Sequence, residues 1–569
     1  MKQLFGNRFR SANLIFCLLF LAGCQTTSPL DSEKDSELSN YLLAIYAGAQ
    51  GDRARASESY LKVLKNNPQN NRLLEEAFSF FLYNGEYENA LKVGRDFYTV
   101  KPANTPVAML LSLEAFKAGE ITAMEGYLSQ VKGFGFDNLM TPLMKAWAAA
   151  RNDNTQTALA ALEPLLETAP FEPFYAEHRA FILDYSGWGA AAEVAYSALV
   201  NRKEITSLQP VLSFGSFLAR RNRDDEALAL YQKFQDLFPD NLQIEGAIKR
   251  LQAGKVPSRG VRDPDRAMAL GFLRTGVELG RDRAFLPAIV YTRFALYLDP
   301  GLDEAYLFLG NLLSNETHPG LALDAFSSVA PDGPFSETAL LRKAFVLNAH
   351  DQWPQAITLV ENYLTQNPGS ENALMALGDL YRTREEYLKA LAYYQRVSTL
   401  KGELGPNDWF LLFARAISYE RLDRWEEAEA DFLKALEFHP EDPDIMNYLG
   451  YSWIDRGLRL EEGRDLIERA VKQRPTSGFI VDSLGWAQYL LGEYKEAVET
   501  LERAVILEPS DPTLNDHLGD AYWKVGRERE ARFQWDHALG LDPAPDDRRK
   551  IEAKIAYGFN LAEALRDRK

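Results

Sequence analysis

The feature that most constrains this 569-residue chain is an internal repeat with a period of 34 residues. The stretch 479–545 contains two copies that superimpose at that shift. The matching pairs are Gly485 with Gly519, Ala497 with Ala531, Leu501 with Trp535, Ala504 with Ala538, and Pro509 with Pro543. A repeat of this length is typical of stacked helical hairpins, because a single hairpin cannot bury its own apolar stripe.

The spacing within each copy has a physical cause. Gly485 in the first helix lets the second helix approach closely, and Ala497 and Ala504 do the same from the second helix. Leu501 fills the space between those two alanines, and Pro509 ends the second helix. This pattern is the signature of the tetratricopeptide repeat (TPR). We therefore predict an all-α fold, a right-handed solenoid of TPR helical hairpins.

The same register extends over most of the chain. It predicts eight consecutive repeats in a C-terminal array over 269–545, and six more degenerate TPR-like repeats over 37–240. Within the N-terminal group, windows 105–138 and 173–206 lack most signature residues and are assigned as repeats from their position alone.

Two segments do not fit the repeat. The phase breaks at 241–268. We expect a helix that runs to about Leu251, followed by an irregular connector between two lobes, because glycine and proline punctuate the sequence after it. At the other end, 546–569 is expected to be a capping helix. Its residues Ile551, Ile555 and Phe559 are spaced to cover the last hairpin.

The N-terminus carries a second strong signal. Positive residues precede a short apolar stretch over 12–20, which is too brief for an ordinary membrane span and ends in Leu21-Ala22-Gly23-Cys24. This resembles the lipobox of bacterial lipoproteins, which implies a signal peptide over 1–23, lipidation of Cys24 and a tether over 24–36. Gln25 favours sorting to the outer membrane, where the protein would be lipid-anchored on the periplasmic face. The alternative is a plain signal peptide with an incidental cysteine.

The charge and cysteine content narrow the classes of function. The formal net charge is −18, and loss of Lys2, Arg8 and Arg10 with the signal would make it −21. Such a balance argues against nucleic acid as a partner. Because Cys17 would leave with the signal, Cys24 would be the only mature cysteine and no intramolecular disulfide is expected.

The sequence offers little catalytic chemistry. Its six histidines are dispersed, without the spacing of a metal site, and no phosphate-binding loop, dinucleotide fingerprint or nucleophile elbow is present. We therefore expect no enzymatic activity, no cofactor and no metal. An enzyme with an unrecognised site is the remaining alternative.

Binding of a protein partner is the more informative hypothesis. Several large aromatic residues are offset by one position from the buried stripe of the first helices, which places them toward the concave side of a solenoid. Such side chains dominate interface energetics. The predicted partner-binding groove consists of Phe410, Phe413, Tyr451, Phe479, Trp486, Tyr489 and Trp523. The alternative is that these residues only pack between successive first helices.

Three short motifs carry a closer resemblance. They are Asn447-Tyr448-Leu449-Gly450-Tyr451, Asp482-Ser483-Leu484-Gly485-Trp486, and His517-Leu518-Gly519 followed by Arg532 and Trp535. They resemble the C-terminal repeats of outer-membrane TPR lipoproteins that are binding partners of periplasmic carboxyl-terminal processing proteases. The resemblance implies a scaffold or protease adaptor that presents cell-envelope substrates such as peptidoglycan hydrolases. The alternative function is a TPR lipoprotein of a polysaccharide-export or outer-membrane assembly machine.

Overall fold

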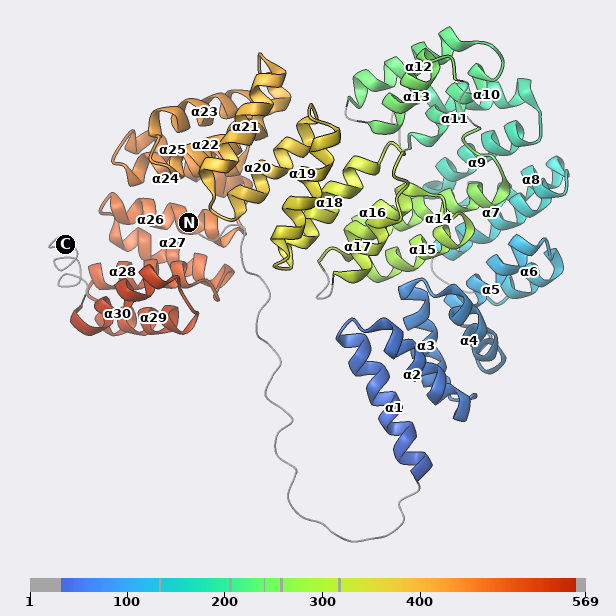
Figure 1. The fold of residues 1–569 in the computed structure, drawn as a ribbon, viewed down its shortest axis with the longest axis horizontal. Coiled ribbons are helices and arrows are strands. Elements are labelled where there is room, and N and C mark those ends of the chain that lie inside the picture. Colours follow the sequence, from blue (N-terminus) through green and yellow to red (C-terminus); the bar gives the residue numbers. More distant parts are fainter. Residues whose placement is uncertain are drawn as a thin grey trace. The chain divides into compact units, whose positions relative to one another are not determined.

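The structure, a computed structural model, describes residues 32–131, 135–203, 207–239, 241–255, 259–315 and 319–558. Every regular element within these ranges is a helix, which confirms the predicted all-α solenoid (Figure 1). The contacts divide the chain into two compact units that meet at Leu359 and Val360. We call the described residues up to 359 the N-terminal unit, and 360–558 the C-terminal unit. Cys24 and the expected signal peptide lie outside the described residues.

The N-terminal unit is built mainly from helices paired in chain order. Its helices are α1 (Ser32–Ala49), α2 (Arg53–Asn66), α3 (Asn71–Asn84), α4 (Tyr87–Val100), α5 (Thr105–Ala118), α6 (Ile121–Leu128), α7 (Gly135–Arg151), α8 (Thr155–Leu162), the short 3₁₀ helices η1 (Glu163–Glu167) and η2 (Ala169–Phe171), α9 (Glu172–Tyr185), α10 (Gly189–Val200), α11 (Gln209–Ala219), α12 (Asp224–Leu237), α13 (Leu242–Gln252), α14 (Pro264–Arg281), α15 (Phe285–Leu298), α16 (Asp303–Leu313), α17 (Gly320–Ser327) and α18 (Ser336–Ala349).

The C-terminal unit continues the same arrangement, and α19 crosses the boundary between the units. Its helices are α19 (Trp353–Gln366), α20 (Glu371–Thr383), α21 (Tyr387–Lys401), η3 (Pro406–Asp408), α22 (Trp409–Arg421), α23 (Trp425–Phe438), α24 (Pro443–Asp455), α25 (Leu460–Gln473), α26 (Gly478–Leu490), α27 (Tyr494–Leu507), α28 (Pro512–Lys524), α29 (Glu528–Gly540) and α30 (Pro545–Tyr557).

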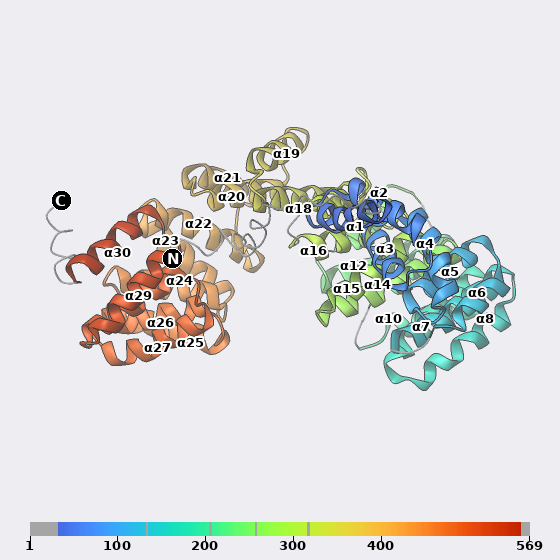
Figure 2. The same ribbon diagram turned by 90° about the horizontal axis from the view of Figure 1, so that it is seen from below.

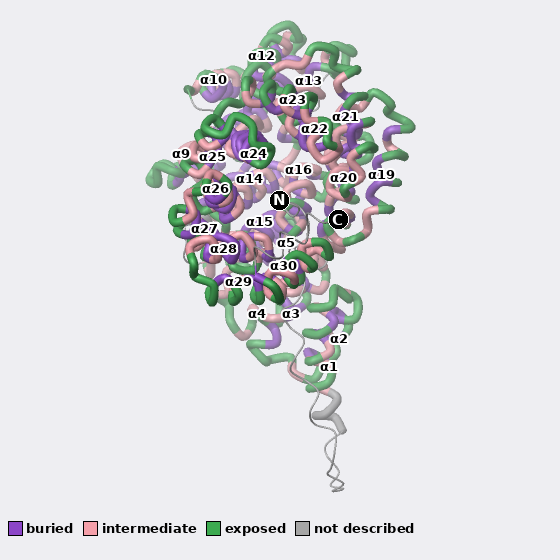
Figure 3. The backbone as a smooth tube through the Cα atoms, turned by 90° about the vertical axis from the view of Figure 1, so that its left-hand side faces the viewer, coloured by how far each residue is buried: buried purple, intermediate pink, exposed green. Residues whose placement is uncertain are grey.

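The small residues of the repeat lie where the two helices of a hairpin touch. A Cβ added to Gly485 would lie 2.6 Å from Cγ of Leu501, and one added to Gly519 would lie 2.5 Å from Trp535. Ala497 and Ala531 are fully buried in the same contacts. Any larger side chain at these positions would push the paired helices apart. Figure 3 shows the resulting pattern, with buried residues where helices pack and exposed residues at turns and outer faces.

The windows that lack signature residues also contain helical hairpins. Helix α5 pairs with α6 within 105–138, and α9 pairs with α10 within 173–206. At the start of the chain, α1 begins at Ser32, inside the segment 24–36 expected to be a tether. At the other end, α30 packs against α29, and Ile551 is buried there as expected for a capping helix, whereas Phe559 lies outside the described residues.

The two compact units divide between Leu359 and Val360 and not at 241–268, where the sequence predicts the boundary between two lobes. Part of that segment is helical, as α13, and the next two helices fold back onto the N-terminal repeats. Helix α14 packs against α7 and α9, and α15 packs against α3 and α5 (Figures 1 and 2). One hydrophobic core therefore runs from Ala44 to Val346. The reason is the composition of α15, FLPAIVYTRFALYL, which is apolar on nearly all sides; beyond its exposed first turn, from Ala288 on, most of its side chains are buried.

Polar contacts join α14 and α15 to the helices that they cover. Arg293 Nε donates to the Tyr83 carbonyl oxygen at 2.9 Å, and the Tyr87 hydroxyl donates to the Arg293 carbonyl at 2.7 Å. Arg274 of α14 pairs with Glu177 of α9 at 2.6 Å. Both members of that ion pair are largely buried, so the contact is part of the core. Helices α14 and α15 thus cover the inner face of the N-terminal hairpins.

Candidate partner-binding surface

In the C-terminal unit, the first helices of successive hairpins lie side by side. Helix α24 contacts α26, and α26 contacts α28, in addition to the contacts within each hairpin. Helix α20 likewise contacts α22, and Phe413 of α22 packs against Tyr448 of α24. The sides of α20, α22, α24, α26 and α28 that face away from the second helices together form the inner side of this array. We call this the first-helix surface. Unlike the inner face of the N-terminal unit, it has no helix equivalent to α14 or α15 packed over it within the same unit.

All seven predicted groove residues are on these first helices, but they differ in exposure. Phe410 on α22 is 41% exposed, whereas Tyr489 on α26 is only 8% exposed and belongs to a hydrophobic core cluster. The other five are half-buried, namely Phe413, Tyr451, Phe479, Trp486 and Trp523. Most of the predicted groove residues are therefore partly buried between helices and expose only one edge of the ring.

The structure brings only two of the seven together. Trp486 and Tyr489 stack with ring centroids 4.7 Å apart. Phe413 instead packs edge-on against Tyr448 of α24, at 5.4 Å, and Trp523 packs against Trp535 of its own hairpin, also at 5.4 Å. The sequence-based alternative, packing between successive helices, therefore describes a large part of what these rings do.

Trp486 has a second neighbour from the next hairpin. His517 of α28 stacks on the indole with ring centroids 4.0 Å apart and nearly parallel planes. Its Nδ1 lies 3.0 Å from an oxygen of Asp482, which is one helical turn before Trp486 on α26. Asp482, Trp486 and Tyr489 share one face of α26, as their spacing predicts. Together with His517 they form a contiguous cluster across two hairpins, which we call the Trp486 cluster.

The electrostatics of this cluster favour a charged imidazole. Burial is the largest influence on the pKa of His517 and lowers it, but the charge of Asp482, its hydrogen bond to the ring and the charge of Asp516 together outweigh burial, so that the pKa lies above its ordinary value. A protonated His517 on the face of Trp486 would add a cation–π attraction. The cluster therefore combines a half-exposed aromatic ring with a pH-sensitive charge.

A second polar cluster links α30 to α28. Lys554 Nζ donates to Asp516 at 2.8 Å and to Asp520 at 2.7 Å, and the Trp535 indole N–H donates to Asp520 at 2.9 Å. Burial raises the pKa of Asp520. Burial also opposes the charge of Lys554, but the two carboxylates outweigh it and raise the pKa of that amine. The capping helix is thus held to the last hairpin by a buried three-residue ion-pair network.

Sequence reasoning missed this network, although a signal for half of it was present. Asp482 and Asp516 occupy the same position in successive repeats, 34 residues apart. Recurrent carboxylates on first helices would have indicated buried partners. Lys554 had no such signal, because it lies on the capping helix outside the repeat.

Neither a metal-binding group of side chains nor a membrane-crossing helix is found in the part of the chain that the structure describes. Within the described residues, no three His, Cys, Asp or Glu side chains are grouped in a way that would hold a metal ion. Among the helices of the same part of the chain, none combines the length and apolar character needed to cross a bilayer.

Comparison with known sequences agrees with the architecture. Family models of the tetratricopeptide repeat match residues 41–105, 346–403 and 413–478, and a further TPR model matches 485–526. These segments, which together cover less than half of the chain, match the tetratricopeptide repeat. The matched segments lie in both units, and they include most of the helices that carry the first-helix surface.

Its bacterial relatives are also TPR-repeat proteins. A TPR repeat-containing protein of Pseudomonas aeruginosa is 28% identical over 197 residues, which are 34% of this chain and 32% of that protein. The TPR repeat-containing protein YpiA of Bacillus subtilis is 22% identical over 327 residues, 54% of this chain and 74% of YpiA. This chain thus spans about a third of the Pseudomonas protein and about three quarters of YpiA.

Among solved structures, the crystal structure of the APC/C hetero-tetramer Cut9–Hcn1 aligns with a TM-score of 0.40 and 13% identity, over 91% of this chain and 96% of that chain. Yeast Tom70 aligns with a TM-score of 0.28 and 11% identity, over 94% and 97% of the two chains.

Proposed function

We propose that this TPR-repeat protein is a membrane-anchored scaffold that holds a protein partner on the first-helix surface of its C-terminal unit. TPR-repeat proteins bind other proteins, and the fold is typically a non-catalytic interaction scaffold. The question for this chain is therefore which surface binds and what kind of partner fits it.

The packing of α14 and α15 is the observation that carries the choice of unit. A TPR array offers a ligand its inner, first-helix side. In the N-terminal unit that side is already covered, because α14 and α15 contact α7, α9, α3 and α5 there. The buried Arg293 donates to a main-chain carbonyl of α3, which fixes α15 in place. A partner would have to displace part of the core to bind at this position.

The C-terminal unit offers a suitable surface for a peptide or helix of a partner. Phe410 is exposed, and Trp486 presents an edge beside the ion pair of Asp482 and His517. Half-exposed aromatic residues next to polar groups are enriched among residues that dominate binding energies. A partner segment with apolar anchors and hydrogen-bonding groups matches this combination.

The finer identity of the partner rests on the sequence. The motifs around Tyr451, Trp486 and Gly519 resemble those of lipoproteins that bind carboxyl-terminal processing proteases. On that basis we propose such a protease as the partner, with peptidoglycan hydrolases among the substrates that the complex brings together. The lipobox-like sequence ending in Cys24 supports anchoring in the outer membrane, facing the periplasm.

Affinity purification tests this proposal. The tagged full-length chain would be recovered from detergent-solubilised cell envelope, and the bound proteins identified by mass spectrometry. Recovery of a processing protease and hydrolases is expected. Synthase or porin-assembly components in their place would favour the export or assembly machine and contradict the adaptor role.

The binding surface is tested by variants in the same experiment. The double variant Phe410→Ala and Trp486→Ala should lose the partner. Phe533→Ala is the matched control, because Phe533 is an aromatic residue that is 69% exposed on a second helix, α29. Equal recovery of the partner by wild type and the double variant would show that another surface binds it.

A further inference from the structure

The N-terminal unit contains a polar pocket of about 290 Å³ that the scaffold role does not use. It lies between α11, α12 and α13 on one side and the segment 259–262 with the start of α14 on the other. The first turn of α16 and Phe335 complete its wall. All of its lining residues belong to one compact unit.

The lining carries an excess of arginine. Arg250, Arg259, Arg262 and Arg266 face the pocket, against two acidic residues, Asp303 and Glu304. This balance is unusual for a chain with a formal net charge of −18. Positive charge concentrated in a concavity raises the local concentration of anions.

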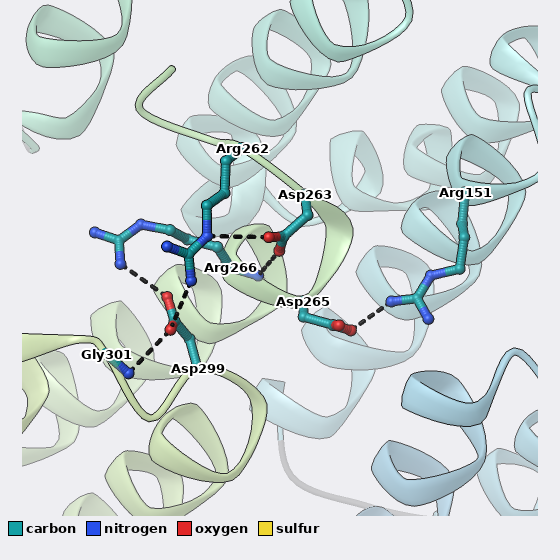
Figure 4. Close-up of polar contacts among 7 residues, drawn as sticks. All are labelled: Arg151, Arg262, Asp263, Asp265, Arg266, Asp299 and Gly301. Carbon is teal, nitrogen blue, oxygen red and sulfur yellow. Dashed lines mark hydrogen bonds and ion pairs between the residues drawn. The ribbon is translucent and has the colours of Figure 1, made fainter. Parts of the chain in front are cut away.

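Two of the arginines already have a carboxylate. Figure 4 shows Arg262 and Arg266 converging on Asp299, a residue that is only 3% exposed. Arg266 reaches one of its oxygens at 2.8 Å and Arg262 the other at 3.1 Å. The Gly301 N–H also donates to Asp299, at 3.0 Å. Asp299 therefore already accepts three hydrogen bonds, two of them from these guanidinium groups.

The other two arginines lack a carboxylate within the described residues. Arg259 has one long contact, 3.5 Å to the Tyr185 carbonyl oxygen, and Arg250 pairs with no acid. The two acids of the lining have other hydrogen-bond partners. Asp303 accepts from the Ala330 N–H at 3.0 Å, and Glu304 accepts from the Gln243 side-chain amide. Two guanidinium groups are thus available to an outside anion.

The segment that carries Arg259 is held close to α11. A Cβ added to Gly260 would lie 2.5 Å from the Ser213 hydroxyl oxygen and 3.2 Å from the Ser213 Cα. Only glycine allows this approach without a shift of the backbone. The position of Arg259 relative to the far wall is therefore set by packing.

We propose that this pocket binds an organic oxyanion, a small molecule that carries a carboxylate or phosphate group on an apolar or aromatic part. The guanidinium fork matches both groups, because its N–H donors pair with two oxygens at once. Gln209 supplies a neutral hydrogen-bonding group, Gln243 donates its side-chain N–H to Glu304, and Leu212 and Phe335 supply apolar wall. The volume suits a small molecule, at the lower end of ordinary ligand sites. The inference is independent of the first-helix surface.

Isothermal titration of the purified full-length chain tests the proposal with four probes: inorganic phosphate, phenyl phosphate, citrate and N-benzoylglycine. We expect at least one aromatic anion to bind with a Kd of about 1 mM or lower, and more tightly than inorganic phosphate. Comparison of the Kd values of phenyl phosphate and N-benzoylglycine shows whether the site prefers a phosphate or a carboxylate. Binding should weaken as salt is raised. No binding by any probe, or equal binding of inorganic and phenyl phosphate, would overturn the proposal.

Variants locate the site. The double variant Arg250→Gln and Arg259→Gln should weaken binding by about tenfold or more, because charge-assisted hydrogen bonds are lost. Lys249→Gln is the matched control: it removes the neighbouring positive charge, which pairs with Glu245 outside the pocket. Equal weakening by both changes would contradict a specific site. Should the double variant fold poorly, hydrogen exchange of the wild-type chain decides, since the ligand must increase protection within 241–266.

Discussion

The buried network that joins the capping helix to the last hairpin gives the sharpest prediction. Replacing Lys554 by methionine keeps most of the side-chain volume and removes the charge. Its side chain is 12% exposed, and that of Asp520 is 4% exposed. The change would leave Asp516 and Asp520 facing each other without a cation.

The expected loss of stability is large for a single helix that packs on one hairpin. Removing one partner from a buried pair typically costs about 3–5 kcal/mol, because the remaining charge stays buried and unpaired. Helix α30 packs only on the last hairpin, so the loss falls on its local opening and not on the whole unit. A loss of about 3 kcal/mol corresponds to roughly a hundredfold increase in the opening of α30.

The cost should depend on pH in a definite direction. Burial raises the pKa of Asp520 from 3.8 to about 7, so the folded state holds its proton more tightly than the unfolded chain. The stability associated with this group is therefore present at low pH and is lost as pH rises from about 4 to about 7. Lys554 opposes that loss. In Lys554→Met the destabilisation should be smaller at pH 5 than at pH 8.

Hydrogen–deuterium exchange of the full chain measures the effect helix by helix. Faster exchange is expected in α30 and the adjoining α28, with α20 unchanged. Adding Asp520→Asn should restore protection at pH 8, because asparagine keeps an oxygen for the Trp535 indole N–H and removes the buried charge. Equal destabilisation at both pH values, with no rescue by Asp520→Asn, would refute the electrostatic explanation.

Three further predictions follow from the repeat, the surface and the N-terminus. Ala531→Leu should overpack its hairpin and lower the free energy of unfolding by about 1–3 kcal/mol. Hydrogen exchange should increase only in this hairpin and its neighbours, and a uniform increase over the C-terminal unit would contradict nearest-neighbour stacking. Phe410→Ala with Trp486→Ala should weaken partner binding per folded molecule by more than about tenfold, measured beside Phe533→Ala. Some loss of Tm is expected because Trp486 stacks on Tyr489 and His517, and a Tm shift at unchanged affinity would make these rings purely structural. Cys24→Ala should move the protein out of the outer-membrane fraction on envelope fractionation, and unchanged fractionation would refute the lipobox.

What the sequence predicted well is what a single repeat determines. The contacts of Gly485 with Leu501, and of Gly519 with Trp535, are made within one hairpin and recur at a fixed spacing. Register, helix pairing and the buried small residues follow from this local pattern. The exposure of the aromatic stripe was harder to predict, because Tyr489 and Trp486 differ in burial although they share one helical face.

What the sequence did not predict depends on contacts between distant parts of the chain. Tyr87 and Arg293 are 206 residues apart, and nothing in the repeat period relates their positions. Arg250 and Arg259 line one pocket, and the contact that relates the second of them to α11 is the close approach of the neighbouring Gly260 to Ser213, which no repeat period encodes. The one available signal was the nearly uniform apolar composition of 285–298. It indicates a largely buried helix but does not identify the helices that pack against it.

The covering of the N-terminal hairpins by α14 and α15 also bears on how this protein reaches its native state. An ordinary solenoid folds through contacts between adjacent repeats, so that its contact order is low and each hairpin is complete soon after it is synthesised. Here the four hairpins from α3 to α10, whose first helices contact α14 or α15, leave the ribosome before residues 264–298 do. Their inner apolar faces stay uncovered during that interval, and such faces promote aggregation. We therefore expect this unit to depend more on a holding chaperone during synthesis than hairpins 409–543, which can fold as they emerge.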